Sequence, residues 1–81
     1  MKIRKANILD ERTVSNVYIY ENKKEEYTLI AIPDIEWSLL VHYEEETEAL
    51  KTRLCHSLSK LIASEYIEPI ANKILHWVRE M

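Results

Sequence analysis

The side chains of this chain that could bind a metal or act as a nucleophile are three histidines and one cysteine: His42, His56, His76 and Cys55. Zinc sites place such ligands in closely spaced pairs, and these positions show no such pairing. Cys55 and His56 are neighbours, but adjacent residues of a helix diverge by about 100° and cannot act together as nucleophile and base. We therefore expect surface histidines, a half-buried structural thiol, no metal and no cofactor.

The acidic stretch at residues 44–48 is the other candidate for chemistry, because paired carboxylates serve in acid–base catalysis and in binding divalent ions. It lies where we expect a helix to begin, and acidic residues favour the positive end of the helix dipole. Neighbouring carboxylates without a pocket give no catalytic signal. We expect these residues to be solvated, no catalytic residue in the chain, and a protein that is not an enzyme.

The 81 residues include no glycine. Phosphate-binding loops, dinucleotide fingerprints and nucleophile elbows need glycine for positive φ or close backbone approach, so these enzyme classes are excluded. Positions with left-handed backbone fall to asparagine or aspartate, and Asn22 is the best placed of them. A chain of this length supports one thin core, so we expect a single small α+β domain over residues 1–81.

Charge and hydropathy limit the partners. Fourteen acidic and eleven basic residues give a net charge of −3, which disfavours nucleic acid and anionic lipid as partners. The longest stretch without a charge has eight residues, 13–20, against the ~20 that span a membrane. A single cysteine indicates a reducing compartment. We expect a cytoplasmic protein with no membrane or nucleic-acid partner and no small-molecule ligand.

Three segments show the composition and alternation of strands: residues 13–20, Tyr27–Ile32 and residues 35–43. The polar residues 21–26 between the first two predict a hairpin loop. Residues 1–12 fit either an edge strand or a short helix, and we assign them as a strand. The sheet is therefore an antiparallel meander of three strands, or of four if the N-terminal segment joins it.

Two helices follow. Leu50, Leu54, Leu58 and Leu61 form one helical stripe, which predicts a helix over residues 47–64. A second stripe, from Tyr66 to Met81, lies about 100° away on a continuous helix, so the chain must break at about residues 64–68. Pro69 fits near the second N-terminus. The fold class is α+β, with two amphipathic helices packed on one face of the meander.

The strands carry more apolar residues than two helices can cover. If Val17 and Ile19 face the helices, then Tyr18 and Tyr20 point away, because side chains alternate along a strand. We expect an interaction surface that includes Tyr18, Tyr20, Trp37 and Leu40. The alternative is that tyrosine tolerates half-exposure in strands, and the sequence favours the two equally.

Two family resemblances follow from these segments. Residues 17–62, with Pro33-Asp34-Ile35 after the second strand and Glu48-Ala49-Leu50 opening a helix, resemble the N-terminal half of HicB-like antitoxins. Glu36-Trp37-Ser38 stands where that family has Pro-Gly-Cys. Over its whole length the chain resembles the YueH-like family of small Gram-positive proteins, chiefly through YTLIAIPDIEW at residues 27–37. That resemblance implies a compact cytosolic protein and carries no established activity.

The sequence therefore leaves the biological role unknown and favours a small, non-enzymatic protein that binds another protein or itself, so a homodimer is one expectation. The alternative is an antitoxin-like or regulatory inhibitor that masks a partner protein, which the HicB-like resemblance implies.

Overall fold

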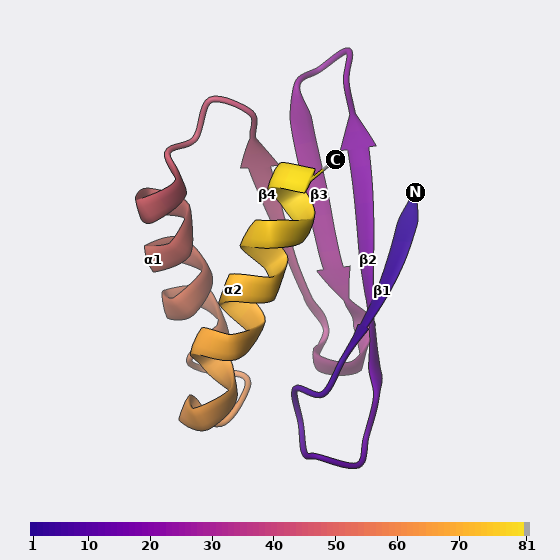
Figure 1. Ribbon diagram of the computed structural model, residues 1–81, viewed down its shortest axis with the longest axis vertical. Coiled ribbons are helices and arrows are strands. Elements are labelled where there is room, and N and C mark those ends of the chain that lie inside the picture. The colour runs from indigo at the N-terminus through magenta and orange to yellow at the C-terminus, as the bar shows by residue number, and fades with distance from the viewer. Residues whose placement is uncertain (81) are drawn as a thin grey trace.

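The computed structural model describes residues 1–80 and shows a sheet of four strands followed by two helices (Figure 1). In chain order the elements are β1 (Lys2–Ala6), β2 (Ser15–Asn22), β3 (Tyr27–Ile32), a 3-10 turn (Pro33–Ile35), β4 (Trp37–His42), α1 (Thr47–Leu58) and α2 (Ser64–Glu80). The strands are antiparallel and neighbour one another in chain order. The predicted α+β meander is confirmed, and the N-terminal segment supplies its fourth strand.

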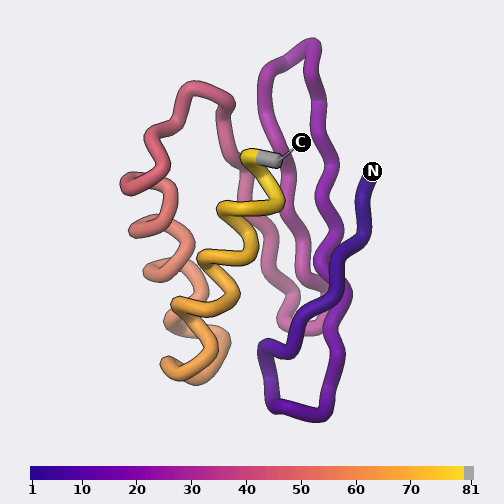
Figure 2. Tube along the Cα trace, viewed as in Figure 1, coloured from indigo at the N-terminus to yellow at the C-terminus, as the bar shows by residue number. Residues whose placement is uncertain are grey.

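Both helices lie against the same side of the sheet (Figures 1 and 2). The apolar side chains of the strands that face them are buried together with the inner stripes of the helices. This core contains Val17, Ile19, Ile30, Ile32, Val41, Leu50, Leu54, Leu58, Ile70 and Ile74. Within residues 1–80, no element covers the opposite side of the sheet.

The β2–β3 hairpin turns without glycine, but Asn22 does not take the left-handed conformation expected of it. Asn22 ends β2, and its side-chain oxygen accepts a hydrogen bond from the Glu25 backbone N–H at 3.0 Å. The left-handed residue is Glu26, with φ of 58°. Asparagine thus stabilises this turn through its side chain, as Asx turns do, and leaves the unusual backbone to a neighbour.

The strand predicted to begin at residue 35 begins at Trp37 instead. Pro33 starts a 3-10 turn, and the Glu36 N–H closes it by donating to the Pro33 carbonyl at 3.0 Å. Glu36 has φ of 51°, a conformation that most chains give to glycine or asparagine. The turn separates Ile35 from the alternation that the sequence suggested it shared with Trp37.

The helix boundaries also differ from the prediction. α1 buries Leu50, Leu54 and Leu58 as expected but ends at Leu58, so that Leu61 is exposed. α2 begins at Ser64, which puts the break at residues 59–63 and places Pro69 inside the helix. Because proline has no N–H, α2 lacks the hydrogen bond that residue 69 would otherwise donate to the Glu65 carbonyl.

Candidate functional site

The side of the sheet that the helices leave uncovered collects apolar side chains from all four strands. Four of the large ones are well exposed: Ile3 (53%), Tyr20 (42%), Leu40 (39%) and Leu29 (37%). We call this surface the open face. By strand alternation its residues are Ile3, Lys5, Asn16, Tyr18, Tyr20, Asn22, Tyr27, Leu29, Ala31, Ser38, Leu40 and His42.

The strand register arranges the open face in two central rows. Tyr20 lies opposite Leu29, and Leu29 lies opposite Leu40, which makes a bulky row that we call the leucine row. In the next row, the alanine row, Ile3 lies opposite Tyr18, Tyr18 opposite Ala31, and Ala31 opposite Ser38. Opposed side chains on one face of an antiparallel pair are close enough to touch. The rows therefore form a continuous surface.

Polar residues border the two rows at both ends. Asn22 and His42 flank Tyr27 at the hairpin end, and Lys5 pairs with Asn16 at the other, where the Lys5 amine donates to the Asn16 side-chain oxygen at 3.2 Å. The Tyr20 and Tyr27 rings lie 6.4 Å apart, tilted by 58°. An apolar centre with a polar rim is the usual composition of a protein–protein interface.

The structure places three of the four predicted interaction residues on the open face: Tyr18, Tyr20 and Leu40. The inclusion of Trp37 is wrong. Its side chain is 6% exposed and faces the helices, where the indole Nε1 donates to the Ser57 hydroxyl of α1 at 2.7 Å. The tryptophan thus joins β4 to α1, and it leaves the open side of that strand to Leu40.

Sequence reasoning missed Ile3 and Leu29. Leu29 carried a usable signal, because it alternates with Ile30 and Ile32, both of which are fully buried. Ile3 carried none, since residues 1–12 fit a strand and a helix equally well. Its place opposite Tyr18 depends on the pairing of β1 with β2.

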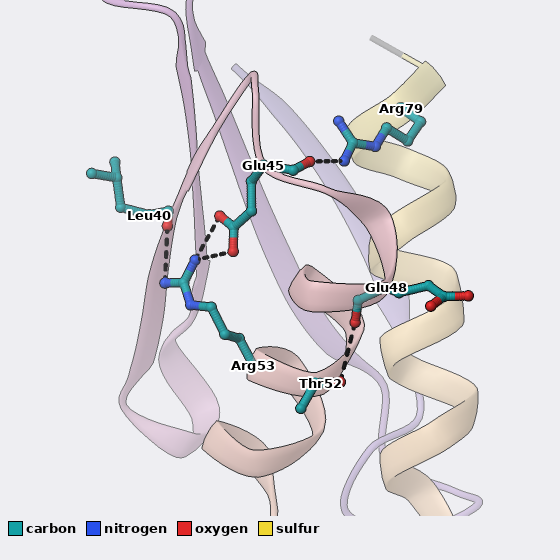
Figure 3. A network of polar contacts seen from close by, with 6 residues as sticks. All are labelled: Leu40, Glu45, Glu48, Thr52, Arg53 and Arg79. Carbon is teal, nitrogen blue, oxygen red and sulfur yellow. Dashed lines mark hydrogen bonds and ion pairs between the residues drawn. The ribbon is translucent and has the colours of Figure 1, made fainter.

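The two edges of the sheet are less available for docking than the open face. At the β4 edge, Arg53 of α1 binds both Glu45 carboxylate oxygens, at 2.5 and 2.6 Å, and donates to the Leu40 carbonyl at 3.4 Å (Figure 3). The β1 edge carries Lys2 and Lys5, and charged residues on an edge strand deter strand addition. In Figure 3 the Leu40 side chain points away from α2, toward the open side.

A cavity of about 220 Å³ lies beside the end of α2. It is lined by Val41 and Val78 and by the polar residues Glu21, Thr28, His42, Tyr43 and Arg79. The Tyr43 hydroxyl donates to the Glu21 carboxylate, and this bond raises the pKa of Tyr43 to about 12. Arg79 donates to the Glu45 carbonyl at 2.6 Å (Figure 3). Small-molecule sites usually measure about 300–1,000 Å³, so this cavity is small for one.

No sequence pattern pointed to this polar group, since Glu21 lies in β2 and Tyr43 in the turn after β4, and only the folding of the sheet brings them together. Of the histidines and the cysteine that did attract attention, His42 lines this cavity and the other three do not. His42, His56 and His76 are all exposed, and Cys55 is half-buried in α1. Among residues 1–80, no three histidine, cysteine or acidic side chains are grouped so that they could hold a metal ion.

The described part of the chain also contains no helix with the length and apolar character needed to cross a bilayer. The architecture is that of a small α+β protein in which a β-meander is covered by helices on one side and presents an apolar, nearly uncharged surface on the other.

Comparison with known proteins identifies the family. The model of the YueH-like proteins matches residues 2–80, and the chain belongs to this family. It is 45% identical over 82 residues to "Uncharacterized protein YueH" of Bacillus subtilis (strain 168), and the match covers the whole of both chains. No solved structure matches it significantly. The family resemblance seen in the sequence is confirmed.

Proposed function

We propose that this protein is a non-enzymatic interaction module of the cytoplasm that binds a protein surface through its open face. The observation that carries the proposal is the gathering of Ile3, Tyr20, Leu29 and Leu40 from four different strands onto one surface. Isolated exposed apolar residues are common, but contiguous apolar patches with a polar rim mark interaction sites.

The charge distribution supports the same proposal. Of the twelve open-face residues, only Lys5 carries a full charge, although the chain has fourteen acidic and eleven basic residues. Charged residues are depleted at the centres of interfaces, because a buried charge must be paired. An unoccupied solvent-facing sheet would gain solubility from lysine and glutamate at these positions.

The polar cavity supports catalysis less well. Its Glu21 carboxylate accepts the hydrogen bond of Tyr43, and its Arg79 guanidinium donates to a backbone carbonyl, so both groups already have partners within the chain. An active site needs a nucleophile or base within reach of a bound substrate. These contacts instead tie the end of α2 and the segment after β4 to the sheet.

Photo-crosslinking in living cells tests the proposal. A photoreactive phenylalanine analogue at Tyr20 should form adducts with protein, identified by mass spectrometry. The same analogue at Leu61, which is 44% exposed in the α1–α2 connection, is the control and should not. Equal yields at the two positions, or none at Tyr20, would contradict the proposal. An antitoxin-like role would give an adduct with one defined heterologous protein, and this adduct should no longer form when Leu40 is changed to Glu.

A further inference from the structure

We infer that the open face is covered by a second copy of this chain, packed face to face so that Leu29 and Leu40 of each copy lie over Ala31 and Ser38 of the other. This inference rests on the proposed function and names the partner. Three properties of the open face support a second copy as the partner: the shape of the two rows, the charge and the area.

The shape of the open face is complementary to itself. On β3 and β4, the leucine row presents two large side chains, and the alanine row presents two small ones directly beside them. A two-fold axis that runs between the rows, parallel to the sheet and perpendicular to the strands, exchanges the rows. It places each leucine over a small residue of the other copy, so the protrusions of one sheet fill the hollows of the other, as in stacked sheets about 10 Å apart.

The same two-fold axis also gives compatible contacts for the other residues of the open face. It stacks β2 of one copy on β2 of the other, with Tyr20 over Tyr18, and aromatic rings pack well in offset or tilted pairs. It also brings the polar row with Asn22 and His42 over the polar row with Lys5 and Asn16. Polar rim then meets polar rim, and each contact occurs twice, as a two-fold interface requires.

Charge favours a second copy over a strongly charged partner. The open face has one charged residue, Lys5, which lies on the outermost strand. A basic or acidic partner would therefore find no opposing charges in the centre, and its own charges would be buried without partners. A second copy brings a centre that is equally free of charge.

The area of the open face sets the expected affinity. The exposed parts of Ile3, Tyr20, Leu29 and Leu40 amount to roughly 340 Å² if a large side chain offers about 200 Å². A standard interface buries about 800 Å² per partner, so these four side chains supply less than half of one and the rest must come from the polar rim. We therefore expect a dimer with a dissociation constant in the micromolar range.

Sedimentation equilibrium of the full chain between about 5 and 500 µM tests the inference. Wild type should shift from monomer to dimer over this range. Leu40→Glu should weaken the dimer at least tenfold, whereas Leu61→Glu, the same change at a similarly exposed leucine away from the open face, should not. Circular dichroism confirms that both variants are folded. A wild type that stays monomeric at 500 µM, or equal effects of the two changes, overturns the inference.

Cysteine crosslinking tests the arrangement. In a Cys55→Ser background, Ser38→Cys should be crosslinked between copies by a bis-maleimide of about 12 Å reach. Ser64→Cys, an exposed serine at the start of α2, is the control and should not be. A dimer that links through residue 64, or does not link through residue 38, overturns the face-to-face pairing. If Tyr20 forms adducts only with a different protein in cells while the pure chain is monomeric, this inference fails and the proposed function stands.

Discussion

Leu29 and Ile30 are neighbours in β3, yet they belong to opposite sides of the sheet and face different surroundings. Ile30 is fully buried under the helices, and Leu29 is 37% exposed on the open face. The two sides have similar apolar content, but only one side contributes its apolar surface to folding of the single chain. The proposed function accounts for this difference, since it assigns the apolar residues of the open face to a contact outside the chain.

The two sides also differ in how they treat polar groups. On the covered side, Trp37 donates to Ser57, and Tyr43 donates to Glu21, so polar side chains link the strands to one another and to α1. On the open face, polar residues stand mainly in the end rows, and the two central rows are apolar except for Ser38. The hydrogen bonds of the covered side therefore connect the sheet to α1 and to the segment after β4, whereas those of the open face, such as Lys5 to Asn16, join neighbouring strands at its ends.

The largest effect should come from substituting across β3. Ile30→Ala should lower the free energy of unfolding by about 2–5 kcal/mol, because it leaves a cavity in the core. Leu29→Ala, one residue away, should cost less than about 1 kcal/mol in the monomer, since its side chain is partly solvated already. Urea denaturation at low micromolar concentration measures both. Equal losses would mean that the open face is packed within a single chain.

The sequence predicted the covered side better than the open one. Alternation in the strands and the leucine stripe of α1 identified the residues that form the core, because burial imposes a period on both kinds of element. Alternation already places Trp37 and Leu40, three residues apart, on opposite faces, so one of the two was misassigned, and alternation alone does not say which face the helices cover. Only the α1 contact with Ser57 decides this, and it joins residues 20 positions apart.

The misplaced boundaries have local causes that composition does not reveal. The sequence predicted one helix through Leu61, since its leucine spacing continues, but the chain turns after Leu58 and buries Ile62 in its place. Glu26 and Glu36 take positive φ in a chain that contains asparagines better suited to it. Tertiary packing overrides residue preference at these positions.

Removing the polar link on the covered side should have the next largest effect. Ser57→Ala leaves the indole N–H of Trp37 without its acceptor, and an unsatisfied buried donor costs about 1–3 kcal/mol. Ser38→Ala changes the same residue type on the open side of β4 and should alter stability by less than about 0.5 kcal/mol. Thermal and urea unfolding of the two variants compare the faces directly. If Ser38→Ala lowered the free energy of unfolding as much as Ser57→Ala, the two sides of the sheet would not differ in their dependence on polar side chains.

Relieving the backbone before β4 should have a smaller and opposite effect. Glu36→Gly replaces a residue with φ of 51° by the one that tolerates it, and should raise stability by about 0.5–1 kcal/mol after the greater freedom of glycine in the unfolded chain is counted. Glu44→Gly is the control, since residue 44 lacks positive φ, and it should give no gain. Glu36 directly precedes Trp37, the first residue of β4. If Glu36→Gly lowered the free energy of unfolding, the Glu36 side chain would contribute more to stability than its positive φ costs.

The smallest effect should come from the pH dependence of the covered side. The hydrogen bond to Glu21 raises the pKa of Tyr43 to about 12, above its ordinary value of 10.0, so the folded state holds this proton more tightly than the unfolded state does. The stability that the Tyr43–Glu21 hydrogen bond adds is fully present below pH 10 and is lost as pH rises from 10 to 12. Tyr43→Phe should therefore show a shallower fall in stability over this interval than wild type.

Tyr66 also makes stability fall at high pH, because desolvation raises its pKa. The quantity to compare is therefore the difference in the free energy of unfolding between wild type and Tyr43→Phe at each pH. Tyr20→Phe on the open face is the matched control and should leave that difference in place. Urea midpoints at pH 9, 10, 11 and 12 measure it. If Tyr20→Phe flattened the profile as much as Tyr43→Phe, the hydroxyl that couples protonation to folding would lie on the open face. The assignment of this pH-dependent contact to the covered side would then be wrong.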